Sequence, residues 1–393
     1  MSQAEMALLK KGLIPYFQPI VEVSTGCITA FEALARYEDD EANVSSAAYL
    51  FGDTSISLKD RREIDQYVRA QAITKASLLP DGTRLTLNIS PELIEYDQDR
   101  PIIHTIEMIE RSSLKPNQVV IELLETKGQV SDLKKLVSVY RDAGMRIAVD
   151  DFGSGFSHFD RAIALEPDVI KLDMKLLKLA SVGGLLAGSA VKSIVDFCTK
   201  SGAVIVVEGV ETEDEFFFGL SCGAHYMQGF LFSPAQKEFL SKDTFQTQIS
   251  ALRKRFFKHM QEESIRSSER YNALITILDE VTLLDLETMA GQQTMEAKLS
   301  SIEGVLRYFI ADSEGYQECP NYVLNNEGRF VDEQTQWKAV NWSWRPYFCQ
   351  ASCSQRAIVS DEYLDIHSGK HCKTAAVRLK NGSVLLVDIN VAV

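Results

Sequence analysis

The sequence has no apolar run long enough to cross a membrane, and its N-terminus, MSQAEMALLKKG, lacks the apolar core of a secretory signal peptide. Cationic residues are in the minority, with 41 Lys and Arg against 55 Asp and Glu, which gives a net charge of −14. That field repels polyanions and argues against long nucleic acid and anionic lipid as partners. Seven cysteines without regular spacing predict reduced thiols. We therefore expect a cytoplasmic protein with no membrane span.

The first 232 residues contain eight strand-like runs. Two lie within residues 16–37 around the turn Ser24-Thr25-Gly26, and so short a connection requires an antiparallel pair. The other six alternate with helical stretches such as 58–78 and 187–201, which predicts parallel strands. These six runs are 85–90, 119–125, 146–152, 169–173, 203–210 and 226–232. Eight strands in about 240 residues match an α/β fold, a modified (β/α)8 TIM-like barrel with an antiparallel first strand.

Glycine and proline, which interrupt helices, are absent from the 56 residues between Ala235 and Ala290. Apolar residues there recur mostly three or four apart, which predicts a long connecting helix. After it, short strands separated by the turn signals NNEG, HSG and KNG predict a small antiparallel sheet. The expected division is a barrel over 1–240, a helical linker over 241–304 and a small domain over 305–393.

Polar residues stand at the ends of the predicted barrel strands, and several of these ends are doubly acidic. They are Glu32, Asn88, Glu122, Glu125, Asp150, Asp151, Lys171, Asp173, Glu208, Glu211 and Gln228. Charged groups at the ends of apolar strands are costly to bury, so the repetition indicates that one site is assembled there. Since neither Cys nor His is among these residues, the oxygen ligands suit Mg²⁺ or Mn²⁺ rather than zinc.

Two of these positions have simpler interpretations. Asp150-Asp151-Phe152-Gly153 could be a strand that ends in a capped turn, whereas two adjacent carboxylates can also serve two metal ions in a phosphoryl displacement. Lys171 could extend to solvent, or it could point into the carboxylate cluster and help to orient and deprotonate an attacking water. The acidic residues at the other strand ends favour the second interpretation in both cases.

Eight motifs, in this order and at this spacing, resemble the EAL domain: YFQPIV, EALAR, LNIS, IELLET, DDFGSGFS, IKLD, VEGVET and QGFLFSPA. The resemblance covers about residues 8–240. It implies a modified β/α barrel that hydrolyses cyclic di-GMP to linear pGpG with two Mg²⁺ or Mn²⁺ ions. Every motif position matches, so nothing in the motifs marks a member that only binds.

The resemblance also implies a role for each matching residue. The implied metal ligands are Glu32, Asn88, Glu122, Asp150 and Asp151. The implied catalytic and supporting residues are Lys171, Glu208, Glu211 and Glu125, with Glu125 anchoring the loop 153–157. The implied substrate contacts are Gln18, Leu34, Arg36, Asp173 and Gln228.

A second resemblance concerns the final segment. WSWRPYF at 342–348, followed by SDEYLDIHSGKHCKTAAVRL at 360–379, is similar to the ligand-sensing half of PAS-like Cache domains, which implies a small α+β domain with an unknown small ligand. The aromatic residues could equally be ordinary core residues. A third possibility is a metal site built from Cys349, Cys353, His367, His371 and Cys372, although their spacing is irregular.

Three functions fit these patterns. The first is a cyclic di-GMP phosphodiesterase regulated by its C-terminal domain, acting as a homodimer. The second is a catalytically silent receptor or scaffold for cyclic di-GMP, and the third is a phosphodiesterase for pGpG or other short oligonucleotides. Sequence patterns alone leave the three open.

Calcium should inhibit hydrolysis. Ca²⁺ prefers longer bonds and more ligands than Mg²⁺, so it would occupy the carboxylates without holding the reacting groups in the octahedral geometry that Mg²⁺ imposes. Turnover of cyclic di-GMP should fall when Ca²⁺ replaces Mg²⁺, while binding persists. Equal rates with the two ions would contradict the predicted site.

Overall fold

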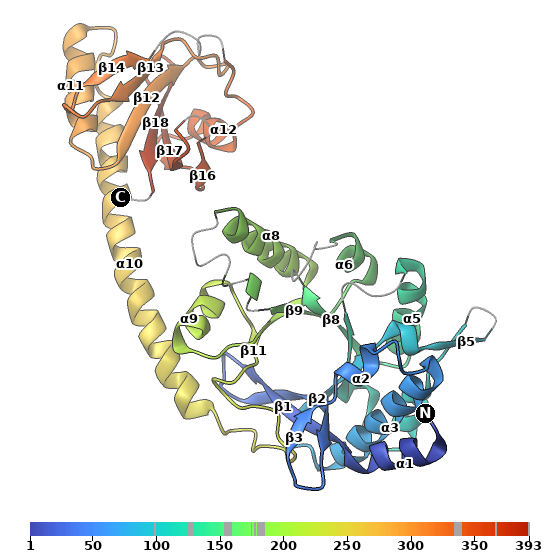
Figure 1. Ribbon diagram of the computed structural model, residues 1–393. Coiled ribbons are helices and arrows are strands. Elements are labelled where there is room, and N and C mark those ends of the chain that lie inside the picture. Colours follow the sequence, from blue (N-terminus) through green and yellow to red (C-terminus); the bar gives the residue numbers. More distant parts are fainter. Residues whose placement is uncertain are drawn as a thin grey trace. The chain divides into compact units, whose positions relative to one another are not determined.

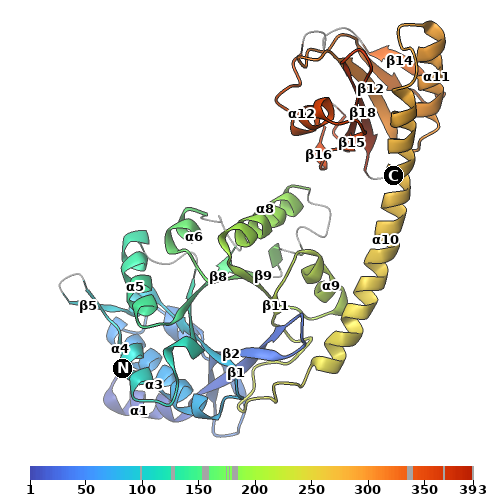
Figure 2. The same cartoon turned by 180° about the vertical axis from the view of Figure 1, so that it is seen from behind.

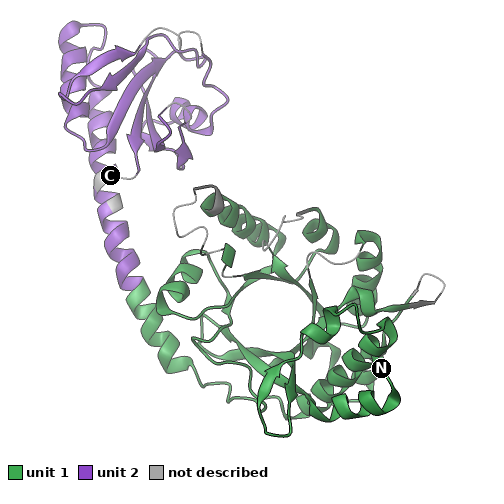
Figure 3. Cartoon of the chain, viewed as in Figure 1, with its two compact units in different colours: residues 1–256 green, residues 257–393 purple. Residues whose placement is uncertain are grey.

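The computed structural model describes residues 1–97, 100–124, 129–152, 159–173, 175–176, 178, 185–333, 340–365 and 368–391. The chain divides into two compact units, residues 1–256 and residues 257–393 (Figure 3). Among the described helices, none combines the length and the apolar character that a membrane span requires.

The elements of unit 1 alternate between strands and helices. The strands are β1 (Leu13–Glu22), β2 (Ile28–Glu38), β3 (Val44–Ser46), β4 (Arg84–Ile89), β5 (Glu95–Asp97), β6 (Arg100–Ile102), β7 (Val119–Leu124), β8 (Arg146–Phe152), β9 (Val169–Asp173), β10 (Val204–Glu208) and β11 (Tyr226–Met227). The helices are α1 (Gln3–Gly12), α2 (Tyr49–Gly52), α3 (Leu58–Lys75), α4 (His104–Glu110), α5 (Val130–Asp142), α6 (Phe159–Leu165), α8 (Leu185–Ser201) and α9 (Glu213–Ser221). Helix α10 (Gln246–Val281) begins in unit 1 and ends in unit 2.

Eight strands of unit 1 close into a barrel in the order β1-β2-β4-β7-β8-β9-β10-β11, with helices around the outside (Figures 1 and 2). Strand β1 runs antiparallel to both of its neighbours, with Gln18 opposite Glu32 in β2 and Val21 opposite Met227 in β11. The other neighbouring pairs around the barrel are parallel. The predicted barrel with its antiparallel first strand is confirmed. Strand β11 is much shorter than the predicted run 226–232.

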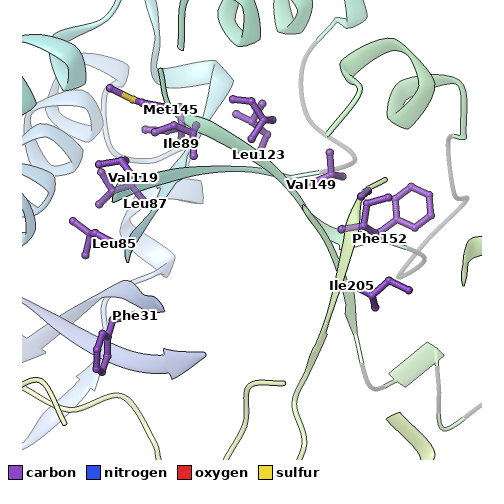
Figure 4. Packing of buried hydrophobic residues seen from close by; sticks show 14 of the residues in the cluster. Phe31, Leu85, Leu87, Ile89, Val119, Leu123, Met145, Val149, Phe152 and Ile205 are labelled. Atoms are coloured by element: carbon purple, nitrogen blue, oxygen red, sulfur yellow. The ribbon is translucent and has the colours of Figure 1, made fainter. Parts of the chain in front are cut away.

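The alternation of side chains along each strand separates two environments. Outward side chains such as Leu85, Leu87 and Ile89 of β4 join a large apolar cluster beneath the helices (Figure 4). Helix α5 contributes a buried stripe spaced three or four residues apart, formed by Leu133, Leu136, Val137 and Tyr140. Packing outside the barrel therefore fixes which side chains face its interior.

Apolar side chains fill one layer of the barrel interior. Ile20, Ala30 and Val206 are buried against one another, with Val169 and Tyr226 packed around them. In the parallel strands the polar site residue lies two positions further along the chain, as Glu32 does after Ala30 and Glu208 after Val206. In the antiparallel strand β1 the order is reversed, and Gln18 lies two positions before Ile20. This packed layer supports the polar residues at the carboxyl ends of the parallel strands.

Unit 2 is a smaller α+β domain built on an antiparallel sheet. Its helices are α11 (Met289–Ser300) and α12 (Pro346–Cys353), and its strands are β12 (Val305–Ala311), β13 (Asn321–Leu324), β14 (Phe330–Glu333), β15 (Ile358–Val359), β16 (Tyr363–Leu364), β17 (His371–Arg378) and β18 (Val384–Asn390). The order is β14-β13-β12-β18-β17-β15, with β16 paired to β17. The antiparallel sheet was predicted, but its central strand β12 was not.

The end of α10 packs into the core of unit 2. Leu274, Leu278 and Val281 recur at helical spacing and are buried with Met295 and Leu299 of α11. The long helix stops at Val281 instead of continuing through the Gly- and Pro-free stretch. The second helix begins where the Thr288 hydroxyl accepts a hydrogen bond from the Gly291 N–H.

Replacing Gly229 with alanine should destabilise unit 1. A Cβ at this position would lie 2.1 Å from the Val210 carbonyl oxygen and 2.3 Å from its nitrogen, so the backbone beside the site would have to move. We expect a cost of about 1–3 kcal/mol or more, seen as a lower Tm in thermal unfolding. The control is Gly188→Ala in α8, where an added Cβ meets nothing within 4 Å. An unchanged Tm in Gly229→Ala would contradict the predicted close approach.

Candidate active site at the carboxyl ends of the barrel strands

Inward residues of five strands bring their charges together in the barrel. The strand register places Asn88 of β4 beside Glu122 of β7, and Glu208 of β10 beside Asp173 of β9. Since inward positions alternate, the last inward side chains of these strands meet at one end of the barrel. The sequence predicted these residues one strand at a time, and the closed barrel is what brings them together.

Lys171 is the centre of this cluster. Its side chain is only 1% exposed, and its ammonium nitrogen contacts four carboxylates. The distances from Lys171 Nζ are 2.5 Å to Glu208 Oε1, 2.8 Å to Glu122 Oε1, 3.3 Å to Glu32 Oε2 and 3.4 Å to Asp150 Oδ1. Lys171 points into the cluster and does not extend to solvent.

The cluster shifts the pKa values of its members. Burial lowers the pKa of Lys171, but the carboxylates of Asp150, Glu122, Glu208 and Glu32 outweigh burial and raise it well above its ordinary value. Burial raises the pKa of Glu122 well above its ordinary value, and the neighbouring Glu32 carboxylate adds to this effect. Burial also raises the pKa of Glu208 well above its ordinary value, although Lys171 opposes the shift. Lys171 is therefore a protonated ammonium among crowded carboxylates.

Glu32 is held by amide groups as well as by Lys171. Asn88 Nδ2 donates to Glu32 Oε1 at 2.7 Å, and Gln228 Nε2 donates to Glu32 Oε2 at 2.7 Å. Gln228 Nε2 also donates to Gln18 Oε1 at 3.1 Å, which links Gln18 to the same network. Burial would raise the pKa of Glu32, but Lys171 and the two amide donors outweigh it and lower the pKa. This carboxylate is therefore kept ionised and oriented.

The adjacent aspartates take up different positions. Asp151 has φ 56°, a left-handed conformation that is uncommon for this residue type, and its N–H donates to Asp150 Oδ1 at 3.0 Å. Oxygens of Asp150, Asp151 and Glu208 lie within 4.8 Å of one another. Burial and the carboxylates of Asp150 and Asp173 raise the pKa of Asp151. The turn therefore aims two consecutive carboxylates at one place.

The donor set fits divalent metal ions. Glu32, Glu122, Asp150, Asp151 and Glu208 are five carboxyl groups, and Lys171 supplies one positive charge, so full ionisation would leave a surplus of four negative charges. Glu122 Oε2 is buried without a hydrogen-bond partner in the described part of the chain. Hard cations such as Mg²⁺ or Mn²⁺ match oxygen donors of this kind and would offset the surplus charge.

Two cavities open beside the cluster. One of about 400 Å³ is lined by Glu32, Leu34, Arg36, Asn88 and Asp150 among others. Another of about 280 Å³ is lined by Gln18, Glu32, Glu208, Glu211 and Gln228 among others. These predicted metal and substrate residues therefore share one region.

Burial lowers the pKa of Arg36, although Glu32 opposes the shift.

Other predicted residues lie at the edge of the site or outside the described residues. The Asp173 side chain accepts a hydrogen bond from the Lys175 N–H and lines neither of these two cavities. Glu211 is exposed at the rim. Glu125 and the loop 153–157 lie outside the described residues, as does His367 of the suggested C-terminal metal set. Within the described chain, Asp150, Asp151 and Glu208 form the one group with metal-ligand spacing.

The sequence analysis missed the wall that α3 contributes to the larger cavity. Asp65 and Arg69 of α3 form an ion pair, and both line that cavity. Arg69 Nη1 also donates to Thr105 Oγ1 at 2.9 Å, while Arg69 Nε and Ser90 Oγ are buried and have no hydrogen-bond partner among the residues that the structure describes. The sequence does contain a pattern that could have predicted this ion pair. Asp65 and Arg69 are opposite charges four residues apart, next to the apolar helix face formed by Ile64, Val68 and Ala72.

Comparison with known protein families identifies both parts of the chain. Residues 1–235 match the EAL domain, and residues 239–393 match the EAL-domain associated signalling protein domain. The first match covers more than half of the chain and contains every residue predicted for the barrel site.

One similar protein matches nearly the whole chain, and another matches a stretch as long as the EAL domain. The chain is 24% identical over 388 residues to the uncharacterized EAL-domain containing protein YkuI of Bacillus subtilis, covering 96% of this chain and 94% of YkuI. It is 25% identical over 235 residues to the cyclic di-GMP phosphodiesterase PdeL of Escherichia coli, covering 58% of this chain and 64% of PdeL. The match to PdeL thus involves less than two thirds of that protein.

Two solved structures are also similar. B. subtilis YkuI in complex with cyclic di-GMP and calcium has a TM-score of 0.87 at 21% identity and covers 100% of both chains, which shows a common fold. Klebsiella pneumoniae BlrP1 in a manganese and cyclic di-GMP complex has a TM-score of 0.51 at 32% identity, covering 57% of this chain and 56% of that one. The barrel fold is thus shared with proteins whose solved structures contain cyclic di-GMP together with calcium or manganese.

Glu122→Gln should stabilise the metal-free protein at about pH 7. Burial and Glu32 raise the pKa of Glu122 in the folded chain, so its ionisation above the ordinary carboxyl pKa lowers folding stability, and a neutral amide avoids this loss. Each 1 kcal/mol gained should raise Tm by roughly 2–4 °C. The benefit should fade below about pH 4, where the carboxyl is protonated in both states.

Thermal unfolding in EDTA measures this effect. Glu110→Gln, at an exposed position in α4, makes the same chemical change and should leave Tm unaltered. A lower Tm for Glu122→Gln in EDTA would show that charge crowding is not what limits stability.

Proposed function

Because the chain belongs to the EAL domain family, we propose that it is a metal-dependent phosphodiesterase that hydrolyses cyclic di-GMP to linear pGpG. The observation that supports this proposal best is the set of four carboxylates around the buried Lys171. PdeL and BlrP1, which match the barrel, are described as acting on or binding cyclic di-GMP. The same site could bind other short nucleotides, so the assay must identify the product.

The proposed reaction adds water to phosphorus and breaks the bond to the 3′ oxygen, so that the product keeps a 5′ phosphate. Two bound Mg²⁺ or Mn²⁺ ions would stabilise charge on the attacking and the leaving oxygen. Glu32, Asn88, Glu122, Asp150 and Asp151 would hold them. The two amide donors on Glu32 keep that carboxylate in place, which reduces the reorganisation needed during reaction.

Lys171 is the group that would act on the water. With four carboxylates around it, Lys171 is charged and works as a hydrogen-bond donor that orients an oxygen. Neutralising those carboxylates would lower the pKa of Lys171, and the amine could then accept a proton from the water. Glu208, 2.5 Å from Lys171 Nζ, would receive or relay that proton. Proton transfer from the water to Lys171 would thus depend on metal ions bound to these carboxylates.

Substrate would enter the larger cavity. Leu34 and Arg36 lie two residues apart on β2 and line that cavity together with the metal-binding candidates. The Arg36 guanidinium offers a planar fork of donors that suits a phosphate. Gln18 and Gln228 would contact the ligand from the adjoining cavity, and Asp173 and Glu211 would act from its margin. Glu125 would anchor the loop 153–157.

Unit 2 would regulate the barrel. It matches a signalling domain associated with EAL domains, and helix α10 contributes residues to both compact units. We propose a homodimer in which this helix or unit 2 takes part in the interface, so that a change in unit 2 alters turnover. The PAS-like character of unit 2 belongs to this proposal.

Glu32→Gln, Asp150→Asn and Lys171→Met should each lower kcat by a factor on the order of 100 or more. Each change removes a ligand charge or the ammonium at the centre of the cluster, and these act on the transition state more than on overall affinity. Purified protein would be incubated with cyclic di-GMP and Mg²⁺ or Mn²⁺, and the products resolved by chromatography. Glu110→Gln serves as the control and should retain wild-type turnover.

The assay also separates the enzyme from a receptor. Formation of pGpG that is lost in the three variants supports hydrolysis. Tight binding of cyclic di-GMP without product under both metals would indicate a silent receptor. Wild-type turnover in Asp150→Asn would refute the two-metal site.

A further inference from the structure

Unit 2 contains a cavity of about 270 Å³ that the barrel chemistry does not use. Aromatic side chains from several elements form much of its lining: Phe309 of β12, Trp342, Trp344, Tyr347 of α12 and Tyr363 of β16. Phe309 and Trp342 pack with ring centroids 5.1 Å apart, whereas Trp344 is 66% exposed at the cavity. An exposed tryptophan beside a hollow provides apolar surface that a ligand could cover.

The cavity also contains an arginine without an acidic partner. The guanidinium of Arg345 lies 4.2 Å from the centroid of the Trp344 ring and 5.8 Å from that of Tyr363. Its Nε is buried without a hydrogen-bond partner, and no ion pair to Arg345 occurs within the part of the chain that the structure describes. Stacking fixes the plane of the guanidinium and leaves its donor edge available.

The other charged groups of the cavity already have partners. Arg307 Nη2 lies 2.9 Å from Asp365 Oδ1, and its Nε lies 2.7 Å from Asp388 Oδ2. Ser368 donates twice to Asp365, while Thr374 and Tyr363 donate to Asp388. Burial opposes this arrangement, but the bonds from Arg307 and Ser368 lower the pKa of Asp365 to about 2. These two carboxylates therefore have little need of a ligand cation.

A comparison of Arg307 with Arg345 indicates what kind of ligand the cavity would bind. Arg307 is neutralised from two sides, whereas Arg345 offers donors to an anion that none of the described residues supplies. Arg345 is also the N-cap residue of α12 and provides no side-chain cap, so the positive end of that helix adds to the same field.

We propose that this cavity binds a small aromatic carboxylate, whose carboxylate pairs with Arg345 and whose ring packs among the tryptophan and tyrosine side chains. A planar carboxylate matches the fork of a guanidinium. The cavity volume of about 270 Å³ is just below the roughly 300–1,000 Å³ usual for ligand sites, which favours a small ligand over a second cyclic dinucleotide. This assignment depends on unit 2 alone and holds whether or not the barrel hydrolyses its substrate.

Tryptophan fluorescence of the full chain can test the proposal. The chain has three tryptophans, Trp337, Trp342 and Trp344, and the last two line the cavity. We expect phenylacetate to cause a saturable fluorescence change. Phenylacetamide and benzylamine carry the same ring without the anion and should bind at least about tenfold more weakly, a difference of about 1.4 kcal/mol or more.

Variants identify the groups responsible. Arg345→Gln should raise the Kd for phenylacetate at least about tenfold, and Trp344→Ala should weaken binding by removing an exposed stacking surface. The matched control is Arg356→Gln, an exposed arginine of the same unit whose loss should not change binding. Thermal unfolding followed by circular dichroism shows whether each variant remains folded. Trp344→Ala keeps the test decisive should Arg345→Gln not fold.

Several results would overturn the assignment. These are the absence of a saturable response to phenylacetate, equal affinity for phenylacetamide, and undiminished binding in folded Arg345→Gln. Tighter binding of phenyl phosphate than of phenylacetate would show that the cavity recognises a phosphate and not a carboxylate. Tighter binding of phenylalanine would show that a ligand ammonium is recognised, contrary to the satisfied state of Asp365 and Asp388.

Discussion

The ion cluster around Lys171 is the interaction on which the barrel's chemistry depends. The Lys171 ammonium is 1% exposed and contacts carboxylates from four different strands. These contacts can form only when the barrel is closed. Burying these groups is costly unless they are paired, and one cation cannot balance the five acidic groups at this end. The remaining negative charge would favour hard cations at this site. A bound metal ion would then couple metal binding to the stability of the barrel through the same carboxylates.

The rest of unit 1 serves to hold that cluster in place. Outward apolar residues pack under the helices, a layer around Ile20, Ala30 and Val206 fills the interior, and the strand register sets which side chains meet. The antiparallel strand β1 matters here because it places Gln18 opposite Glu32, so that the amide network includes Gln228. Gly229 then allows the backbone after Gln228 to approach Val210. Support for the site thus extends well beyond its charged residues.

Unit 2 uses charge in another way. Arg307 is neutralised by Asp365 and Asp388, whereas Arg345 lies against aromatic rings and has no acidic partner among the described residues. The first arrangement needs no ligand, whereas the second leaves hydrogen-bond donors at a cavity that the proposed ligand would use. The sequence of unit 2 matches an EAL-domain associated signalling protein domain.

The sequence by itself determined the strand and helix pattern, the antiparallel start of the barrel and the residue types at the strand ends, because these follow from short-range periodicity and turn chemistry. It also placed Lys171 in an apolar run, but left open where that side chain points. Only the tertiary structure decided this, since four carboxylates from distant positions meet it. The sequence analysis missed β12, which pairs with β13 and β18 in the sheet of unit 2. It also missed the Asp65–Arg69 pair at the larger cavity, whose position depends on how α3 packs against β1 and β2. Local patterns specify elements, whereas closure of the sheet specifies which charges become neighbours.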